Sequence, residues 1–253
     1  MRIDLNADLG ESFGPWTMGD DEAMLDVVTS ASIACGGHAG DPEVMFATVQ
    51  NAVRRGVTVG AHPGYADRLG FGRRAIPMTA PEIGRLVAAQ VGALHGVARL
   101  AGAEVGYVKP HGALANLAAD DRDVATAIAE AVRAVSRDLA VLAISGTALQ
   151  DAARSAGLRV YAEVFADRAY LPNGRLVPRS RPDAMIHDAE AAATRLMTFL
   201  DSGLMPVIGG DPVRLAVDSV CVHGDSPSAV GMARTLRMRL TERGMVVAPF
   251  LAG

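Results

Sequence analysis

The sequence predicts a single α/β domain built on a parallel sheet. Short apolar runs that end in small and polar residues recur about seven times, with helical segments between them. Such alternation favours parallel strands joined by helical crossovers. The chain has 253 residues, of which 50% are apolar, and this suits one α/β barrel or two smaller domains. A single barrel over residues 1–253 is the preferred topology, and an open sheet is the alternative.

The expected strands share one feature, which is an apolar run that stops at polar residues. Four of the six histidines lie at such ends. In parallel α/β proteins the carboxyl ends of the strands carry the functional site. The expected strands and their polar residues are, in chain order, 3–5 with Asn6, Asp8 and Glu11; 32–34 with His38; 57–60 with His62, Tyr65 and Arg73; 105–108 with Lys109 and His111; 139–144 with Ser145 and Thr147; 160–165, containing Glu163, with Asp167 and Arg168; and 217–222 with His223.

Capping signals predict where the helices begin. Asp41 precedes Pro42, and Thr79 is followed by Pro81 and Glu82, which are typical of helix starts. The segment 167–182 is polar and is expected to be a loop with a turn at 172–174, and residues 207–216 are expected to form a small hairpin. The expected helices are a short one from Asp20, then 41–55, 79–101, 121–135, 147–156 and 183–200, and a last one from Ser226 or Ser228 to Arg243.

Composition excludes several classes of protein. The net charge is −4, and no basic patch with interleaved aromatic residues indicates nucleic-acid binding. No uninterrupted apolar stretch reaches the length of about 18 residues that a membrane span needs. The two cysteines, Cys35 and Cys221, lie in apolar runs and are expected to be buried free thiols. The first residues are acidic where a signal peptide would be apolar, so we expect a cytoplasmic protein.

A carboxylate and four imidazoles are expected to meet at one end of the barrel. Asp8 and the four strand-end histidines would suit a zinc or iron hydrolase, or acid–base catalysis without a metal. No HxH or HxxxH pair supplies two ligands from one element. We therefore assign no residue as a metal ligand, and a weakly bound divalent metal is the alternative. In the metal-free hypothesis Asp8 or a histidine is the general base.

The cationic residues near these ends suit anion binding. Lys109 and the arginines Arg68, Arg73 and Arg74 would hold a carboxylate or a phosphate. The alternatives are a solvated arginine pair and, for Lys109, a salt bridge to Asp8 or Glu163. No GxxxxGK[ST] or GxGxxG motif is present, and the double glycines at 36–37 and 209–210 either admit a phosphate or form ordinary turns.

Several longer segments resemble one known family. These segments are DLNADLGE, ACGGHAGDP, VGAHPGYADRLGFGRR, YVKPHGAL, EVFADRAY with LVPRSRP, and VCVHGD, and they run from Asp4 to about Asp225. They are similar, in sequence and in order, to the LamB/YcsF family. The resemblance implies a seven-stranded, TIM-like (β/α) barrel akin to the glycoside hydrolase/deacetylase group.

The same resemblance implies an activity. The family is assigned as the A subunit of a bacterial ATP-dependent 5-oxoprolinase, which cleaves 5-oxo-L-proline to L-glutamate while ATP is hydrolysed to ADP and phosphate. It implies ATP with Mg²⁺ as the nucleotide counter-ion, and partner subunits B and C, without which the A subunit is not expected to turn over. Either ATP binds here without a familiar motif, or a partner supplies the phosphoryl step.

We combine the residue pattern and the resemblance into one expected site. The expected catalytic residues are Asp8, His62, Lys109 and His111, and the expected substrate-binding residues are Asn6, His38, Tyr65, Arg73, Glu163, Arg168 and His223. Two other functions stay open. One is a stand-alone metal-dependent deacetylase or amidohydrolase, and the other is a non-catalytic subunit that binds the lactam for a partner.

Overall fold

The computed structural model describes residues 2–224 and 228–251, and its centre is a closed ring of seven parallel strands. The ring closes because the last of these strands pairs with both the sixth and the first. The strands, in ring order, are β1 (Arg2–Leu9), β2 (Ser30–Ala34), β3 (Thr58–His62), β4 (Tyr107–Val108), β5 (Ala140–Ile144), β6 (Arg159–Phe165) and β9 (Ser219–Val222). The prediction of a seven-stranded parallel barrel is confirmed, and the open sheet is excluded.

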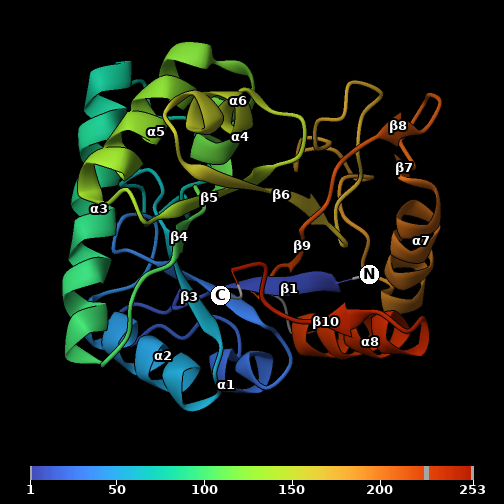
Figure 1. Ribbon diagram of the computed structural model, residues 1–253, viewed down its shortest axis with the longest axis horizontal. Helices are drawn as coiled ribbons and strands as arrows, with labels where there is room; N and C mark the ends of the chain where they lie inside the picture. The colour runs from blue at the N-terminus through green and yellow to red at the C-terminus, as the bar shows by residue number, and fades with distance from the viewer. Residues whose placement is uncertain (1, 225–227, 252–253) are drawn as a thin grey trace.

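Helices surround the ring, with α3 and α5 on one side and α7 and α8 on the other (Figure 1). Their apolar faces pack on the outside of the barrel in one large core. The helices are α1 (Asp21–Leu25), α2 (Pro42–Arg54), α3 (Ala80–Leu100), α4 (Gly112–Asp120), α5 (Arg122–Val135), α6 (Ala148–Ser155), α7 (Ala189–Ser202) and α8 (Ala229–Glu242). Within the described ranges, no helix combines the length and the apolar character that a membrane crossing requires.

The caps that the sequence predicted are present. The Asp41 carboxylate accepts hydrogen bonds from the backbone N–H groups of Glu43 and Val44, which α2 leaves without helical partners. Thr79 and Glu82 form a capping box at the start of α3. Ser228 precedes α8, whereas Ser226 lies outside the described residues.

Several elements differ from the prediction. The helix expected from Asp183 begins only at Ala189, because Asp188 is the residue that caps it. Helix α4 was not predicted, and it begins directly after His111. A short strand that was not predicted, β10 (Val246–Val247), pairs with the start of β1. A hairpin is present, but its first strand, β7 (Leu204–Met205), lies before the predicted range 207–216, and its second strand is β8 (Val213–Arg214).

Strand alternation makes the inside of the barrel polar. In β1, Ile3, Leu5 and Ala7 belong to the outer core, while the residues between them make contacts inside the ring. For example, the Asn6 amide donates hydrogen bonds to Glu163 and Ser219. Successive strand residues point to opposite faces, so one face of β1 packs against helices and the other faces the ring. Charged side chains therefore lie inside this barrel.

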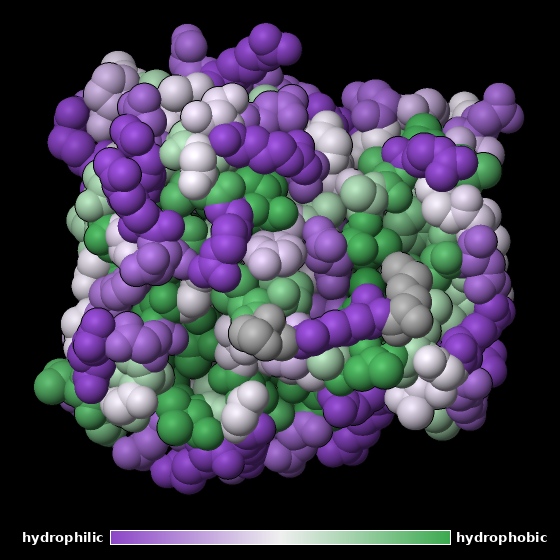
Figure 2. All heavy atoms as spheres, viewed as in Figure 1, coloured by the Kyte–Doolittle hydropathy of each residue, from purple (hydrophilic) through white to green (hydrophobic). Residues whose placement is uncertain are grey.

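Aromatic side chains close the amino end of the barrel. The Phe250 ring lies 5.0 Å from that of Tyr107 and 4.6 Å from that of Tyr161, and Leu142 packs in the same cluster. On the face seen in Figure 2, apolar side chains show between hydrophilic ones. The carboxyl end of the barrel is therefore the end that is open to a ligand.

Candidate active site

A cavity of about 350 Å³ lies at the carboxyl ends of the strands. Its volume falls in the range of about 300–1,000 Å³ that is usual for small-molecule sites. The strand ends and the segment after β6 supply its charged and imidazole side chains. These are Asp8, His62, Arg73, Lys109, His111, Glu163, Arg168, Arg179 and His223.

Lys109 forms the floor of the cavity and is paired inside the protein. Its ammonium Nζ lies 2.8 Å from Asp8 Oδ1 and 2.7 Å from Glu163 Oε1. It also donates to Asn6 Oδ1 at 3.0 Å and contacts Cys221 Sγ at 3.1 Å. The interpretation of Lys109 as a cation that awaits a substrate anion is therefore wrong, and the alternative salt bridge to Asp8 and Glu163 is present.

This buried group keeps Lys109 and Asp8 charged. Burial would lower the pKa of Lys109, but the carboxylate of Asp8 and its other acidic neighbours raise that pKa well above its ordinary value. Burial would raise the pKa of Asp8, but His62 and Lys109 outweigh it, and the pKa lies well below the usual range. A carboxylate with so low a pKa is a poor proton acceptor near neutral pH. The pKa of Glu163 is raised, chiefly by burial.

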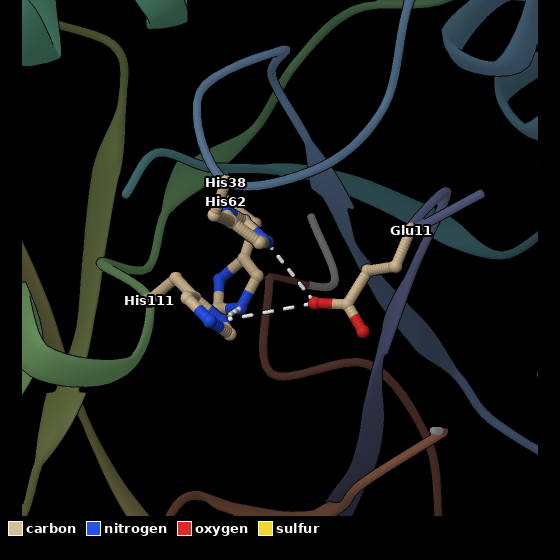
Figure 3. Close-up of side chains that lie close together, drawn as sticks. All are labelled: Glu11, His38, His62 and His111. Atoms are coloured by element: carbon tan, nitrogen blue, oxygen red, sulfur yellow. Dashed lines mark hydrogen bonds and ion pairs between the residues drawn. The ribbon is translucent and has the colours of Figure 1, made fainter. Parts of the chain in front are cut away.

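Three buried imidazoles and one carboxylate form a cluster beside this floor. His38 and His111 stack with ring centroids 3.7 Å apart, and His62 meets both rings edge-on. Figure 3 shows the Glu11 carboxylate facing the rings. One ligand atom from each of Glu11, His38, His62 and His111 lies within 4.8 Å of the others, so the cluster could hold a metal ion.

The sequence pattern did not assign this ligand set, and in particular it left Glu11 out of the site. Glu11 was noted only as a polar residue after the first strand. Its position on the same strand end as Asp8 was a signal that could have placed it here. The contact between His38 and Glu11 joins the ends of β2 and β1. Because each ligand of the cluster comes from a different element, no short sequence motif marks it.

The glycine-rich loop after β3 wraps closely around the imidazoles. A Cβ atom on Gly72 would approach His38 Cβ to 2.7 Å and His111 Cδ2 to 2.9 Å. Phe71 is the non-glycine residue with positive φ among those described, at 53°, and its carbonyl accepts a hydrogen bond from His111 Nε2. Such strained backbone persists where the surroundings hold it, often at functional sites. Here it holds the His111 ring in one orientation.

A second acid–imidazole pair lies across the cavity. His223 Nδ1 is 2.7 Å from Asp167 Oδ2, and the His223 ring stacks on Phe165. Burial would raise the pKa of Asp167, but His223 outweighs this effect and the pKa is lowered. The ionised carboxylate therefore fixes the ring through Nδ1. The sequence indicated His223 for the site and did not indicate that Asp167 would orient it.

Only some of the expected arginines reach the cavity. Arg73 and Arg168 line it, and so does Arg179, which the sequence did not single out. Burial lowers the pKa of Arg168 to about 10, so this guanidinium is still charged at neutral pH. Arg74 is instead paired with Asp67 in its own loop, and Arg68 lies over the Phe13 ring, 3.8 Å from its centroid.

The expected site residues thus fall into three groups. The lining of the cavity includes Asp8, His62, Arg73, Lys109, His111, Glu163, Arg168 and His223. Asn6 lies beneath Lys109, and His38 lies behind His111, so four of the five residues expected to share one cavity line it. Tyr65 is fully buried in the outer core and lies outside this lining.

The fold and the cavity define the class of protein, a closed parallel (β/α) barrel with its ionisable residues gathered at the carboxyl ends of the strands. The chain belongs to the LamB/YcsF family, whose model matches residues 3–252. The resemblance seen in the sequence is therefore confirmed over the whole barrel.

Relatives and solved structures agree with this assignment. A protein of Pseudomonas syringae pv. tomato, named as a 5-oxoprolinase A subunit, is 52% identical over 98% of this chain and 97% of its own length. The 5-oxoprolinase A subunit of Azorhizobium caulinodans is also 52% identical, over 98% of each chain. The crystal structure of a lactam utilization protein from Thermus thermophilus superposes with a TM-score of 0.92 at 42% identity, covering 98% of this chain and 99% of that one.

Proposed function

We propose that this chain is the A subunit of an ATP-dependent 5-oxoprolinase. It opens the lactam of 5-oxo-L-proline to L-glutamate while ATP is hydrolysed to ADP and phosphate, and it works with partner subunits B and C. The relatives that carry the 5-oxoprolinase name, matched over nearly the full length, are the observation that carries the proposal. The cavity supports it because its size and charges suit a small anionic lactam.

The arginines of the cavity wall bind the anionic groups. Oxoproline carries a carboxylate, and phosphorylation of its amide oxygen would add a phosphoryl group. Arg73, Arg168 and Arg179 place guanidinium groups in the lining, and guanidinium binds both anions through paired N–H donors. ATP, with Mg²⁺ as its counter-ion, either reaches this cavity or reacts on a partner subunit.

The Asp167–His223 pair is the proton carrier in this proposal. Opening the lactam adds water to the carbonyl carbon and breaks the bond from that carbon to the ring nitrogen, which must gain a proton to leave as an amine. His223 lines the cavity, and Asp167 holds its Nδ1. The Nε2 atom of His223 is then the one that exchanges protons, as in other acid–imidazole pairs.

Asp8 and Lys109 have an electrostatic role. The low pKa of Asp8 disfavours the general-base role that the sequence had suggested for it. Fixed charges in a buried site cost no reorganisation when charge develops on the substrate. The Asp8–Lys109–Glu163 group therefore fixes the field at the floor of the cavity, where Asp8 Oδ2 lies 3.4 Å from His62 Nε2.

The test is ATP hydrolysis that depends on 5-oxoproline, measured for this chain alone and with subunits B and C. We expect glutamate and phosphate in equal amounts from the complete mixture and little turnover from the chain alone. A complete mixture that hydrolyses ATP at the same rate with and without 5-oxoproline would refute the proposal.

The cluster of Glu11 with three histidines favours a second candidate, a metal-dependent amidohydrolase. Such an enzyme would open an amide without ATP, and the metal that these four residues would hold could supply Lewis-acid chemistry. Amide hydrolysis by the isolated chain, abolished by a chelator and indifferent to ATP, would identify this function instead.

A further inference from the structure

The hydrogen bonds of His62 and His111 fix which nitrogen of each ring carries a proton. His62 Nδ1 lies 2.7 Å from the backbone carbonyl of Lys109, and His111 Nε2 lies 2.8 Å from that of Phe71. A carbonyl oxygen only accepts, so both of these ring nitrogens carry hydrogen. In neutral imidazoles the remaining nitrogens, His62 Nε2 and His111 Nδ1, then hold lone pairs.

These two lone pairs point at each other. His111 Nδ1 and His62 Nε2 are 3.0 Å apart, which is a hydrogen-bond distance with no hydrogen left to share. The other close atoms are also acceptors, since Asp8 Oδ2 is 3.4 Å from His62 Nε2 and Glu11 Oε1 is 3.7 Å from His111 Nδ1. A cation between the two rings is required, either an added proton or a metal ion.

The charges around the rings favour a divalent ion over a proton. Two carboxylates lie against the rings, with Asp8 Oδ2 3.4 Å from His62 Nε2 and Glu11 Oε1 3.0 Å from His38 Nε2. A neutral imidazole is the form that binds metals.

We propose that Glu11, His38, His62 and His111 bind one divalent transition-metal ion. The ligand atoms are those that face one another, which are Glu11 Oε1, His38 Nε2, His62 Nε2 and His111 Nδ1. The carbonyls of Lys109 and Phe71 are the outer partners that fix the ring tautomers, which is how metal-bound histidines are usually held. Three nitrogens and one oxygen suit zinc, iron or cobalt, whereas magnesium and calcium prefer oxygen ligands. The inference does not depend on the proposed function.

The test is metal binding by the full chain after dialysis against a chelator. We expect one equivalent of Zn²⁺ by calorimetry, visible absorption bands on adding Co²⁺, and no heat with Mg²⁺. His62→Gln and His111→Gln should weaken Zn²⁺ binding by at least about 100-fold, since each removes a ligand outright. The control is His187→Gln, an exposed imidazole outside the cluster, which should bind as the wild-type chain does.

A second measurement uses the wild-type chain, so it tests the proposal even if the variants fail to fold. In ¹⁵N spectra of the wild-type imidazoles, Zn²⁺ should shift His62 Nε2 and His111 Nδ1 and leave His187 unchanged. Three results would overturn the proposal. These are substoichiometric binding by the wild-type chain, undiminished binding by folded ligand variants, and a spectrum in which a proton stays between the two rings after Zn²⁺ is added.

Discussion

His38 and His111 lie face to face, with ring centroids 3.7 Å apart and ring planes within 3° of parallel. They follow different strands, β2 and β4, and β3 lies between these strands in the barrel. The stack is possible because the loop after β3 crosses the rings with glycine at position 72, where a side chain would collide with both. Barrel closure and a glycine loop thus create the cluster together.

Asp167→Asn should slow catalysis without unfolding the protein. Asparagine keeps the shape of the side chain, but it loses the charge that holds His223 Nδ1. We expect the kcat of oxoproline-dependent ATP hydrolysis by the complete complex to fall by about 10²- to 10⁴-fold. His187→Gln, outside the cavity lining, is the control. Wild-type kcat in a folded Asp167→Asn complex would remove the pair from the mechanism.

Arg73→Gln should weaken substrate binding more than turnover. Arg73 is exposed at the cavity wall, so its replacement should leave the fold intact. A charge-assisted hydrogen bond contributes about 1.5–3 kcal/mol, so KM for 5-oxoproline or ATP should rise roughly 10- to 100-fold. Arg85→Gln, an exposed arginine on α3, is the matched control. A fall in kcat with unchanged KM for both substrates would argue against anion binding by Arg73.

Lys109→Met should destabilise the fold. The substitution leaves the buried carboxylates of Asp8 and Glu163 without their ammonium. Removing one partner of a buried ion pair costs about 3–5 kcal/mol of unfolding free energy. Denaturant unfolding measures this loss of unfolding free energy. Arg99→Met, which breaks the exposed Arg99–Glu104 pair, should cost less than about 1 kcal/mol, and equal losses in the two variants would contradict this reasoning.

Gly60→Ala should destabilise the barrel from inside. An added Cβ would lie 2.2 Å from the Tyr107 ring, which is itself fully buried. Overpacking of this kind costs about 1–3 kcal/mol. Gly92→Ala is the comparison, because that glycine is exposed within α3 with nothing within 4 Å of the new atom. It should stabilise the protein by about 0.5–1 kcal/mol. Thermal melting of the two variants should therefore shift in opposite directions.

The two thiols should be unreactive in the folded protein. Cys35 and Cys221 are free and buried, and burial raises the pKa of Cys35 to about 12. At pH 8 roughly one Cys35 thiol in 10⁴ would be ionised, and the thiolate is the reactive form. A thiol reagent such as Ellman's should label neither cysteine in the native chain and both in denaturant. Rapid labelling before unfolding would show that the barrel opens at these positions.

Local pattern was enough to predict the architecture. The alternation of apolar runs and helical segments predicted a parallel barrel, and Asp41 and Thr79 marked true helix starts because capping acts between residues only a few positions apart. The position of three histidines at strand ends also correctly predicted that they line the cavity, because parallel strands end on the same side. These are His62, His111 and His223. The missed elements, α4 and β10, are short or follow a turn that carries no strong signal.

The sequence by itself therefore determined the barrel, its family and most of the residues around the cavity. The tertiary structure alone decided what each of them touches. Lys109 is paired with Asp8 and Glu163, Glu11 joins the imidazoles, and Asp167 orients His223. None of these contacts follows from spacing along the chain, because the partners are on different strands that meet only when the ring closes. Charge pairing depends on distances of about 3 Å, and only the folded barrel sets them.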